Sequence, residues 1–228
     1  MNIVFAYPTG LNPQKGGVER ITDIIAKILL KRGYTIFYLN WKREQDNYEY
    51  PVPVIDLPSS NLEDPNNLEV YNRFLKENRI DVIINQHGLY EGTYFLSQVK
   101  VQNVKIISVL HSDPFGYYNH LFADLMTLRD SSIKEKVKRV ARFFLYRKVK
   151  KIIHRSLVNH YTFIQEHPQY VCLLSESYKE RLEEYCDLPD NYFISIPNPN
   201  TYENIEIIPH KEPILLFVGR LDNRSKKL

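Results

Sequence analysis

Residues 3–39, IVFAYPTGLNPQKGGVERITDIIAKILLKRGYTIFYL, carry the pattern that decides the fold. Residues 3–7 form an apolar run that ends at a proline, which is typical of a buried parallel strand. Over residues 18–31 the apolar positions recur every three or four residues, which predicts an amphipathic helix. Gly33 suits the left-handed residue that ends a helix, and residues 34–39 predict a second strand. This order indicates a parallel strand–helix–strand unit.

The same alternation continues along the rest of the chain. Further strands are predicted at residues 52–57, 80–84, 104–110, 170–174 and 192–196, and further helices from residue 64 and over residues 90–99, 133–158 and 176–185. Pro53 restricts the first of these strands to a sheet edge. The pattern predicts an α/β fold, a Rossmann-like doubly wound parallel sheet with helices on both faces. Because ligands bind such sheets beyond the carboxyl ends of the strands, residues that follow strands are the functional candidates.

Composition narrows the class of protein. The 228 residues are 43% hydrophobic and carry a formal net charge of +3, which favours a globular domain and gives no sign of nucleic-acid binding. Cys172 and Cys186 have no CxxC spacing, so we expect reduced thiols and no metal. The first residues lack the basic segment of a signal peptide, and no window approaches the ~20 apolar residues of a membrane span. We therefore expect a cytoplasmic protein.

Three groups of residues follow predicted strands. Gly16 and Gly17 open the first helix, where glycines admit a close ligand and helix N–H groups favour a phosphate. The dinucleotide pattern GxGxxG and the phosphate-loop pattern GxxxxGK[ST] are absent. His111 suits a hydrogen bond to a sugar hydroxyl or a phosphate, and Asn85 and His87 suit a carbohydrate pocket. Each group has a structural alternative. The glycines would then form a turn that only starts the helix, His111 would only cap local backbone groups, and residues 85–88 would be a polar turn without a ligand.

Residues 133–155 hold a concentration of positive charge opposed by one acid, Glu135. The basic residues are Lys134, Lys136, Lys138, Arg139, Arg142, Arg147, Lys148, Lys150, Lys151 and Arg155. Apolar residues recur between them at helical spacing. Such a helix can lie on anionic lipid or face a diphosphate-bearing lipid acceptor, and the residues expected to face the membrane are Lys138, Arg142, Arg147 and Lys150. The alternative is a solvated helix whose apolar stripe packs on the sheet.

The end of the sequence is predicted to be a linker followed by a strand. Residues 197–213 contain four prolines and no periodicity, and residues 214–218 form a last apolar run. Arg220 and Lys226 follow this run, where their side chains suit a diphosphate. A single strand has no partner layer to cover it, so we expect the chain to be truncated inside a second α/β unit.

Taken in order, these motifs resemble the retaining glycosyltransferases of family 4, which have the GT-B fold. The matching residues are Gly16, Gly17, Glu19 and Arg20 in the first loop, His111 after a strand, Ser175 and Glu176 before a helix, Pro197 and Asn198 before the linker, and Gly219, Arg220, Leu221 and Lys226 at the end. The resemblance covers nearly the whole chain. Two departures are Pro199, where the family usually has glycine, and the absence of the family's paired glutamates.

The resemblance implies two Rossmann-like domains that face each other across a cleft, and a sugar transferred from a nucleotide-sugar donor with retention. It implies a donor-phosphate site of Gly16, Gly17, Arg220 and Lys226, a catalytic His111, an acceptor site of Asn85, His87, Glu19 and Arg20, and a hinge at Asn198. The acceptor would be a glycan or a lipid-linked sugar used in cell-surface polysaccharide synthesis, and the protein would act in the cytoplasm, peripherally at the inner face of the membrane. No metal or cofactor is expected, because helix dipoles and basic side chains neutralise the leaving diphosphate.

The resemblance also implies the domain organisation. Residues 1–200 would form the acceptor-side domain, residues 201–212 the linker, and residues 213–228 the start of the donor domain. The chain alone is therefore expected to be inactive. Two alternatives remain open: a non-catalytic subunit that binds the acceptor or anchors to the membrane, and a nucleotide-sugar epimerase of similar architecture. No partner nucleic acid is expected.

Overall fold

The structure is a computed structural model that describes residues 1–42, 47–88, 91–126, 132–167, 169–183 and 192–199. The chain divides into two compact units. The first, here named the sheet unit, comprises residues 1–114 and 157–198, and the second, the helical unit, includes residues 115–156. The predicted linker 201–212, the predicted start of a second domain, Cys186, Arg220 and Lys226 lie outside the described residues.

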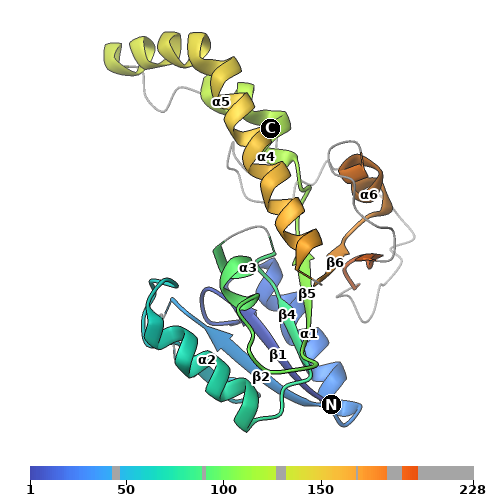
Figure 1. Ribbon diagram of the computed structural model, residues 1–228. Coiled ribbons are helices and arrows are strands. Elements are labelled where there is room, and N and C mark those ends of the chain that lie inside the picture. Colours follow the sequence, from blue (N-terminus) through green and yellow to red (C-terminus); the bar gives the residue numbers. More distant parts are fainter. Residues whose placement is uncertain (43–46, 89–90, 127–131, 168, 184–191, 200–228) are drawn as a thin grey trace, which may run out of the picture. The chain divides into compact units, whose positions relative to one another are not determined.

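The sheet unit contains a seven-stranded parallel sheet (Figure 1). Its strands are β1 (Asn2–Tyr7), β2 (Thr35–Asn40), β3 (Val54–Asp56), β4 (Val82–Asn85), β5 (Lys105–Leu110), β6 (Gln169–Leu173) and β7 (Phe193–Ser195). The strand order is β3-β2-β1-β4-β5-β6-β7, with every neighbouring pair parallel. The seven strands predicted within residues 3–196 are confirmed, and β3 lies at the edge that Pro53 indicated. Because the chain passes from β3 back to the other side of β1, the order reverses between β1 and β4.

Local signals in the sequence explain where the helices begin and end. The helices are α1 (Gly17–Lys31), α2 (Pro65–Glu77), α3 (Glu91–Leu96), α4 (Gly116–Met126), α5 (Ile133–Glu166) and α6 (Glu176–Glu183). The carboxylate of Asp64 accepts a hydrogen bond from the Asn66 amide at 3.0 Å and so caps α2, which has proline at its first position. Gly33 follows α1 with a φ of 83°, the left-handed conformation that the sequence predicted.

Alternate residues of β1 enter two different apolar cores. Val4 and Ala6 belong to a core with Tyr71 of α2 and with residues of α3. Ile3 and Phe5 belong to a second core that includes apolar residues of α1. Since successive strand residues point to opposite faces, α1 covers one face of the sheet and α2 and α3 cover the other. The predicted Rossmann-like doubly wound fold is confirmed.

The structure departs from the sequence prediction in the helices that follow β5. Helix α4 was not predicted. Helix α5 continues to Glu166, past the predicted end at residue 158. Its last part contains His160, Tyr161 and Ile164, whose side chains are buried in the sheet unit. Tertiary packing of these residues sustains the helix where local propensity is weak.

The apolar stripe of α5 is exposed within the helical unit. The fractional exposures are 80% for Ile133, 63% for Val137, 57% for Val140 and 78% for Phe144. Their spacing places the four side chains along one face of the helix. The periodicity therefore predicted the helix correctly, but no described element covers this face.

Candidate functional site

A hollow of 340 Å³, lined by both polar and apolar side chains, lies at the carboxyl ends of the central strands of the sheet unit. It is lined by Tyr7, Val18, Gln86, His87, Gly88, Val109, Leu110, His111 and Ser112. These residues come from the ends of β1, β4 and β5 and from the first turn of α1. The hollow therefore lies where the strand order reverses, which is the place where open α/β sheets bind ligands. Among its described lining residues there is no lysine, arginine, aspartate or glutamate.

His111 directly follows β5, and Gln86 directly follows β4, its neighbour in the sheet. The Nε2 atom of His111 lies 2.5 Å from Oε1 of Gln86. Because an amide oxygen can only accept, this contact places the proton on Nε2 and leaves Nδ1 as an acceptor. Burial lowers the pKa of His111 from 6.5 to about 4, so the ring is neutral at pH 7. The arrangement holds an uncharged imidazole in a fixed orientation.

His87 forms the neighbouring wall of the hollow. Its ring packs edge-on against Tyr7, with centroids 6.0 Å apart, and lies 6.3 Å from the ring of Trp41. Burial, and to a smaller extent the positive charge of Lys42, lowers the pKa of His87 from 6.5 to about 4. Both histidines of the hollow are therefore neutral at physiological pH.

Asn85, the last residue of β4, is fully buried behind the hollow. Its Nδ2 donates to Oγ1 of Thr93 at 3.0 Å and to Oγ of Ser108 at 3.4 Å. Its Oδ1 accepts from the backbone amide of His87 at 3.0 Å. Asn85 does not line the hollow. Instead it ties β4 to β5 and α3 and fixes the turn that presents His87.

Gly88 completes this turn because no side chain fits there. A Cβ at this position would lie 2.8 Å from the Val109 carbonyl oxygen. The Gly88 carbonyl accepts a hydrogen bond from Nε2 of His160 at 3.1 Å, and His160 Nδ1 lies 3.2 Å from the Tyr94 hydroxyl, which donates to it. Burial lowers the pKa of His160, which keeps the ring in this neutral form. The final part of α5 therefore supports the wall of the hollow.

The first loop lies beside the hollow, and Val18 is its contribution to the lining. Gly16 is the residue before α1 and provides no side-chain cap, while a Cβ on Gly17 would meet nothing within 4 Å. Glu19 is buried with its carboxylate folded back against Gly16, at the positive end of the helix dipole. Arg20 is exposed and does not line the hollow.

The structure thus brings together only part of the predicted site. His87 and His111 line one hollow, whereas Asn85 lies behind it and Glu19 and Arg20 lie outside its lining. Asn198 is exposed, beyond the end of β7. Gln86 lies between Asn85 and His87 in the polar motif that follows a predicted strand, but the sequence analysis did not select it as a site residue. The sequence analysis also missed His160, which has no local signal because it is 72 residues away from Gly88 in the chain.

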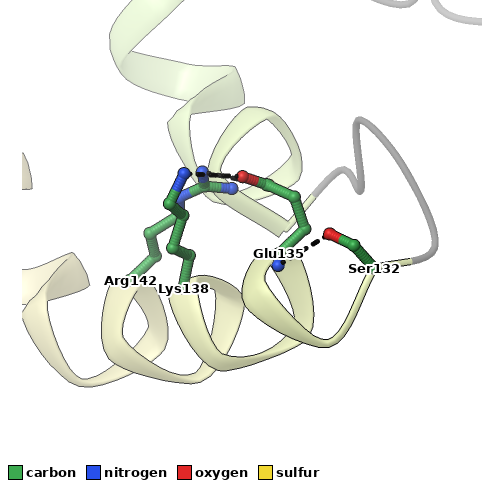
Figure 2. Close-up of polar contacts among 4 residues, drawn as sticks. All are labelled: Ser132, Glu135, Lys138 and Arg142. Carbon is green, nitrogen blue, oxygen red and sulfur yellow. Dashed lines mark hydrogen bonds and ion pairs between the residues drawn. The ribbon is translucent and has the colours of Figure 1, made fainter.

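The basic residues predicted to face a membrane fall into two pairs. Lys138 and Arg142 bind the carboxylate of Glu135, with N–O distances of 3.0 and 3.3 Å (Figure 2). The amide of Glu135 also donates to Oγ of Ser132, which caps the start of α5. Arg147 and Lys150 instead line a second hollow, within the helical unit.

Three further observations concern metal binding, membrane spans and the cysteine of the sheet. No three His, Cys, Asp or Glu side chains among the described residues are grouped closely enough to hold a metal ion. In the same part of the chain, no helix has the length and apolar character required to span a membrane. Cys172 is a buried free thiol on β6, and burial raises its pKa.

No protein-family model and no curated protein matches the sequence. Among solved structures, the chain is similar to WaaG, a glycosyltransferase involved in lipopolysaccharide biosynthesis, with 15% identity, a TM-score of 0.47, and coverage of 88% of this chain and 46% of that one. It is also similar to a proposed epimerase from Burkholderia cenocepacia J2315, with 12% identity, a TM-score of 0.39, and coverage of 75% and 52%. The chain spans about half the length of these proteins. Neither TM-score reaches 0.5, so the fold described above rests on this chain's own sheet order.

Proposed function

We propose that this chain is the acceptor-side half of a glycosyltransferase that moves a sugar from a nucleotide-sugar donor to a glycan or lipid-linked acceptor. The observation that carries the proposal is the hollow at the reversal of strand order, whose described lining holds no charged side chain and in which Gln86 holds neutral His111. Sugars present many hydroxyl groups, each of which both donates and accepts hydrogen bonds. A site of neutral imidazole and amide groups matches that chemistry.

His111 has the role of contacting the transferred sugar. With Nε2 donating to Gln86, its Nδ1 accepts a hydrogen bond from a sugar hydroxyl without adding charge. His87 provides a second neutral ring in the same hollow. The lack of GxGxxG and GxxxxGK[ST] patterns in the first loop favours this function over a dinucleotide enzyme or a phosphate-loop enzyme.

The donor phosphates would be shared between the first loop of the sheet unit and a second domain that begins at residue 213. The open space above Gly17 admits a phosphate near the first amides of α1. The resemblance found in the sequence assigns the remaining contacts to Arg220 and Lys226 and implies that the anomeric configuration is retained. Helix amides and these two side chains would neutralise the leaving diphosphate without a metal ion.

The helical unit would hold the protein at the inner face of the membrane, where cell-surface polysaccharides are assembled from lipid-linked acceptors. The exposed apolar stripe of Ile133, Val137, Val140 and Phe144 supports this placement. Basic residues flank the stripe along the same helix, and a helix of this type binds anionic lipid surfaces. The same observation favours the second candidate function, a non-catalytic subunit that anchors an acceptor for a separate enzyme.

The test is the transferase activity of the complete gene product, measured with a panel of nucleotide sugars and lipid-linked or glycan acceptors. We expect His111→Ala to lower kcat/KM by at least about a hundredfold, as expected for loss of a group that contacts the reacting sugar. The matched control is His120→Ala, which removes an exposed histidine of α4 and is expected to retain full activity. The 228-residue chain alone is expected to be inactive.

Three outcomes would overturn parts of this proposal. Full activity in His111→Ala would remove the hollow from the active site. Interconversion of the nucleotide sugar without an acceptor would replace transfer with epimerisation. A complete gene product that binds acceptor and anionic vesicles but never turns over a donor would establish the anchoring subunit instead.

A further inference from the structure

A second hollow lies within the helical unit, beside a contact between α4 and the middle of α5. The two helices are in contact through aromatic rings. The ring centroids of Phe122 and Tyr146 lie 5.2 Å apart, and those of Tyr118 and His154 lie 5.5 Å apart. The hollow beside this contact has a volume of 340 Å³. It is lined by Tyr118, Arg147, Lys150, Lys151 and His154. Its volume is at the lower end of the roughly 300–1,000 Å³ of small-molecule sites.

The spacing of the α5 residues explains how they converge. Lys150 and Lys151 follow Arg147 by three and four positions, and His154 follows Lys151 and Lys150 by three and four, so the four side chains share one face of the helix over two turns. The Lys150 ammonium is held over the ring of Tyr118, 4.7 Å from its centroid. Tyr118 comes from α4, so the hollow depends on the tertiary packing of two helices and not on one helix surface alone.

The hollow differs from the other basic cluster of α5 in its charge balance. Lys138 and Arg142 both pair with Glu135. By contrast, Arg147, Lys150 and Lys151 have no ion pair within the described part of the chain, and no acid lines the hollow. Like charges at these spacings destabilise a helix. An uncompensated cluster of this kind indicates a place for an external anion.

The lining groups specify the class of anion. The arginine presents a planar fork of donors, and the two lysines add point charges, which together match a group with several oxygens and more than one negative charge. A single carboxylate would leave most of that charge unbalanced. We propose that the hollow lined by Tyr118, Arg147, Lys150, Lys151 and His154 binds a phosphate or diphosphate group. Its identification with the acceptor's diphosphate rests on the proposed transferase function, whereas phosphate binding itself does not.

The test measures binding of inorganic pyrophosphate to the 228-residue chain by isothermal titration calorimetry at physiological salt. We expect the double variant K150Q/K151Q to bind pyrophosphate at least about tenfold more weakly than the wild type. The matched control is K134Q/K136Q, which removes two exposed lysines of the same helix away from the hollow. We expect it to change pyrophosphate affinity by less than about threefold. Circular dichroism verifies that both variants are folded.

A second arm distinguishes a lipid headgroup from a soluble phosphate compound. If the hollow takes a headgroup, pyrophosphate will displace the chain from phosphatidylglycerol vesicles, and K150Q/K151Q will bind them more weakly than K134Q/K136Q. If it takes a soluble compound, pyrophosphate will bind without affecting vesicle attachment. Both results support the proposal.

Three results would overturn it: no pyrophosphate binding, equal losses in the two double variants, or a preference for a short DNA duplex that both variants lose equally. The transferase proposal fails separately, because it is judged by donor turnover in the complete gene product. A protein that turns over donor but ignores pyrophosphate in this assay would contradict the phosphate site alone.

Discussion

Phe5 in the sheet unit and Phe144 in the helical unit both belong to regular apolar patterns of the sequence, but their side chains differ in burial. Phe5 lies on β1 and is fully buried, whereas 78% of the Phe144 side chain on α5 is exposed. The strand has a helical layer on each face of its sheet, and the described residues offer no layer to the outer face of α5. Periodicity therefore predicts an element, while burial depends on a partner that the local sequence does not identify.

The largest expected effect is the difference in stability loss between alanine substitutions of these two phenylalanines. Phe5→Ala should lower the free energy of unfolding by about 3–5 kcal/mol, because it leaves a cavity in a closed core. Phe144→Ala should lower it by less than about 0.5 kcal/mol, because the ring is already in solvent. Urea denaturation of the 228-residue chain, followed by circular dichroism, measures both. A loss at Phe144 as large as that at Phe5 would show that the stripe is covered in solution.

A smaller effect is the dependence of stability on pH that buried His111 gives to the sheet unit. The pKa of His111 is lowered from 6.5 to about 4 by burial, so the unfolded chain takes up a proton first as pH falls. The stability that depends on a neutral His111 is therefore fully present above pH 6.5 and is lost progressively as the pH falls toward 4. Between pH 7 and pH 5 the wild type should lose roughly 1–2 kcal/mol more stability than His111→Gln.

The measurement is a pair of urea titrations at the two pH values. The variant His120→Gln is the control, since it replaces an exposed histidine and should retain the wild-type dependence on pH. If His111→Gln and the wild type lose the same stability on acidification, His111 is not buried in its neutral form.

The smallest expected effect concerns the helical unit. The Glu135 side chain is 9% exposed and pairs with Lys138 and Arg142. Glu135→Gln should lower the free energy of unfolding by at most about 1 kcal/mol. It should also strengthen binding to phosphatidylglycerol vesicles by roughly two- to fivefold, because two cations lose their internal partner.

The control for charge is Glu69→Gln, which removes an exposed acid of α2 that pairs with Arg73. This change alters the net charge equally but lies in the sheet unit, so vesicle binding should stay within about twofold. An equal gain in both variants, measured by vesicle sedimentation, would show that net charge and not the helical unit governs attachment.

Much of the sheet unit was predictable, because buried parallel strands are short apolar runs bounded by turns. Asp64, Pro65 and Gly33 each carried a local signal that the structure confirms. Helix α4 was missed because its segment has mixed polarity and no recognisable cap. The last part of α5 was missed because burial of Tyr161 and Ile164, and not local propensity, sustains it.

The candidate site was predictable only in outline. The rule that ligands bind after strands selected His87 and His111, and the structure places both in the lining of one hollow, while their roles stay predictions. It could not reveal that Asn85 turns inward, because a polar residue at a strand end can serve either backbone or ligand. The support from His160 depends on a contact between distant parts of the chain, which a single sequence does not encode locally.

The proposed function depends most directly on His111, which is neutral in the hollow at the reversal of strand order and whose Nδ1 can accept a hydrogen bond. Long-range ¹H–¹⁵N NMR of the chain labelled with ¹⁵N-histidine measures the protonation of each ring nitrogen. We expect His111 to carry its proton on Nε2 at pH 7 and to have a pKa of about 4. A ring that titrates near its usual pKa of 6.5, or that carries the proton on Nδ1 at pH 7, would contradict it.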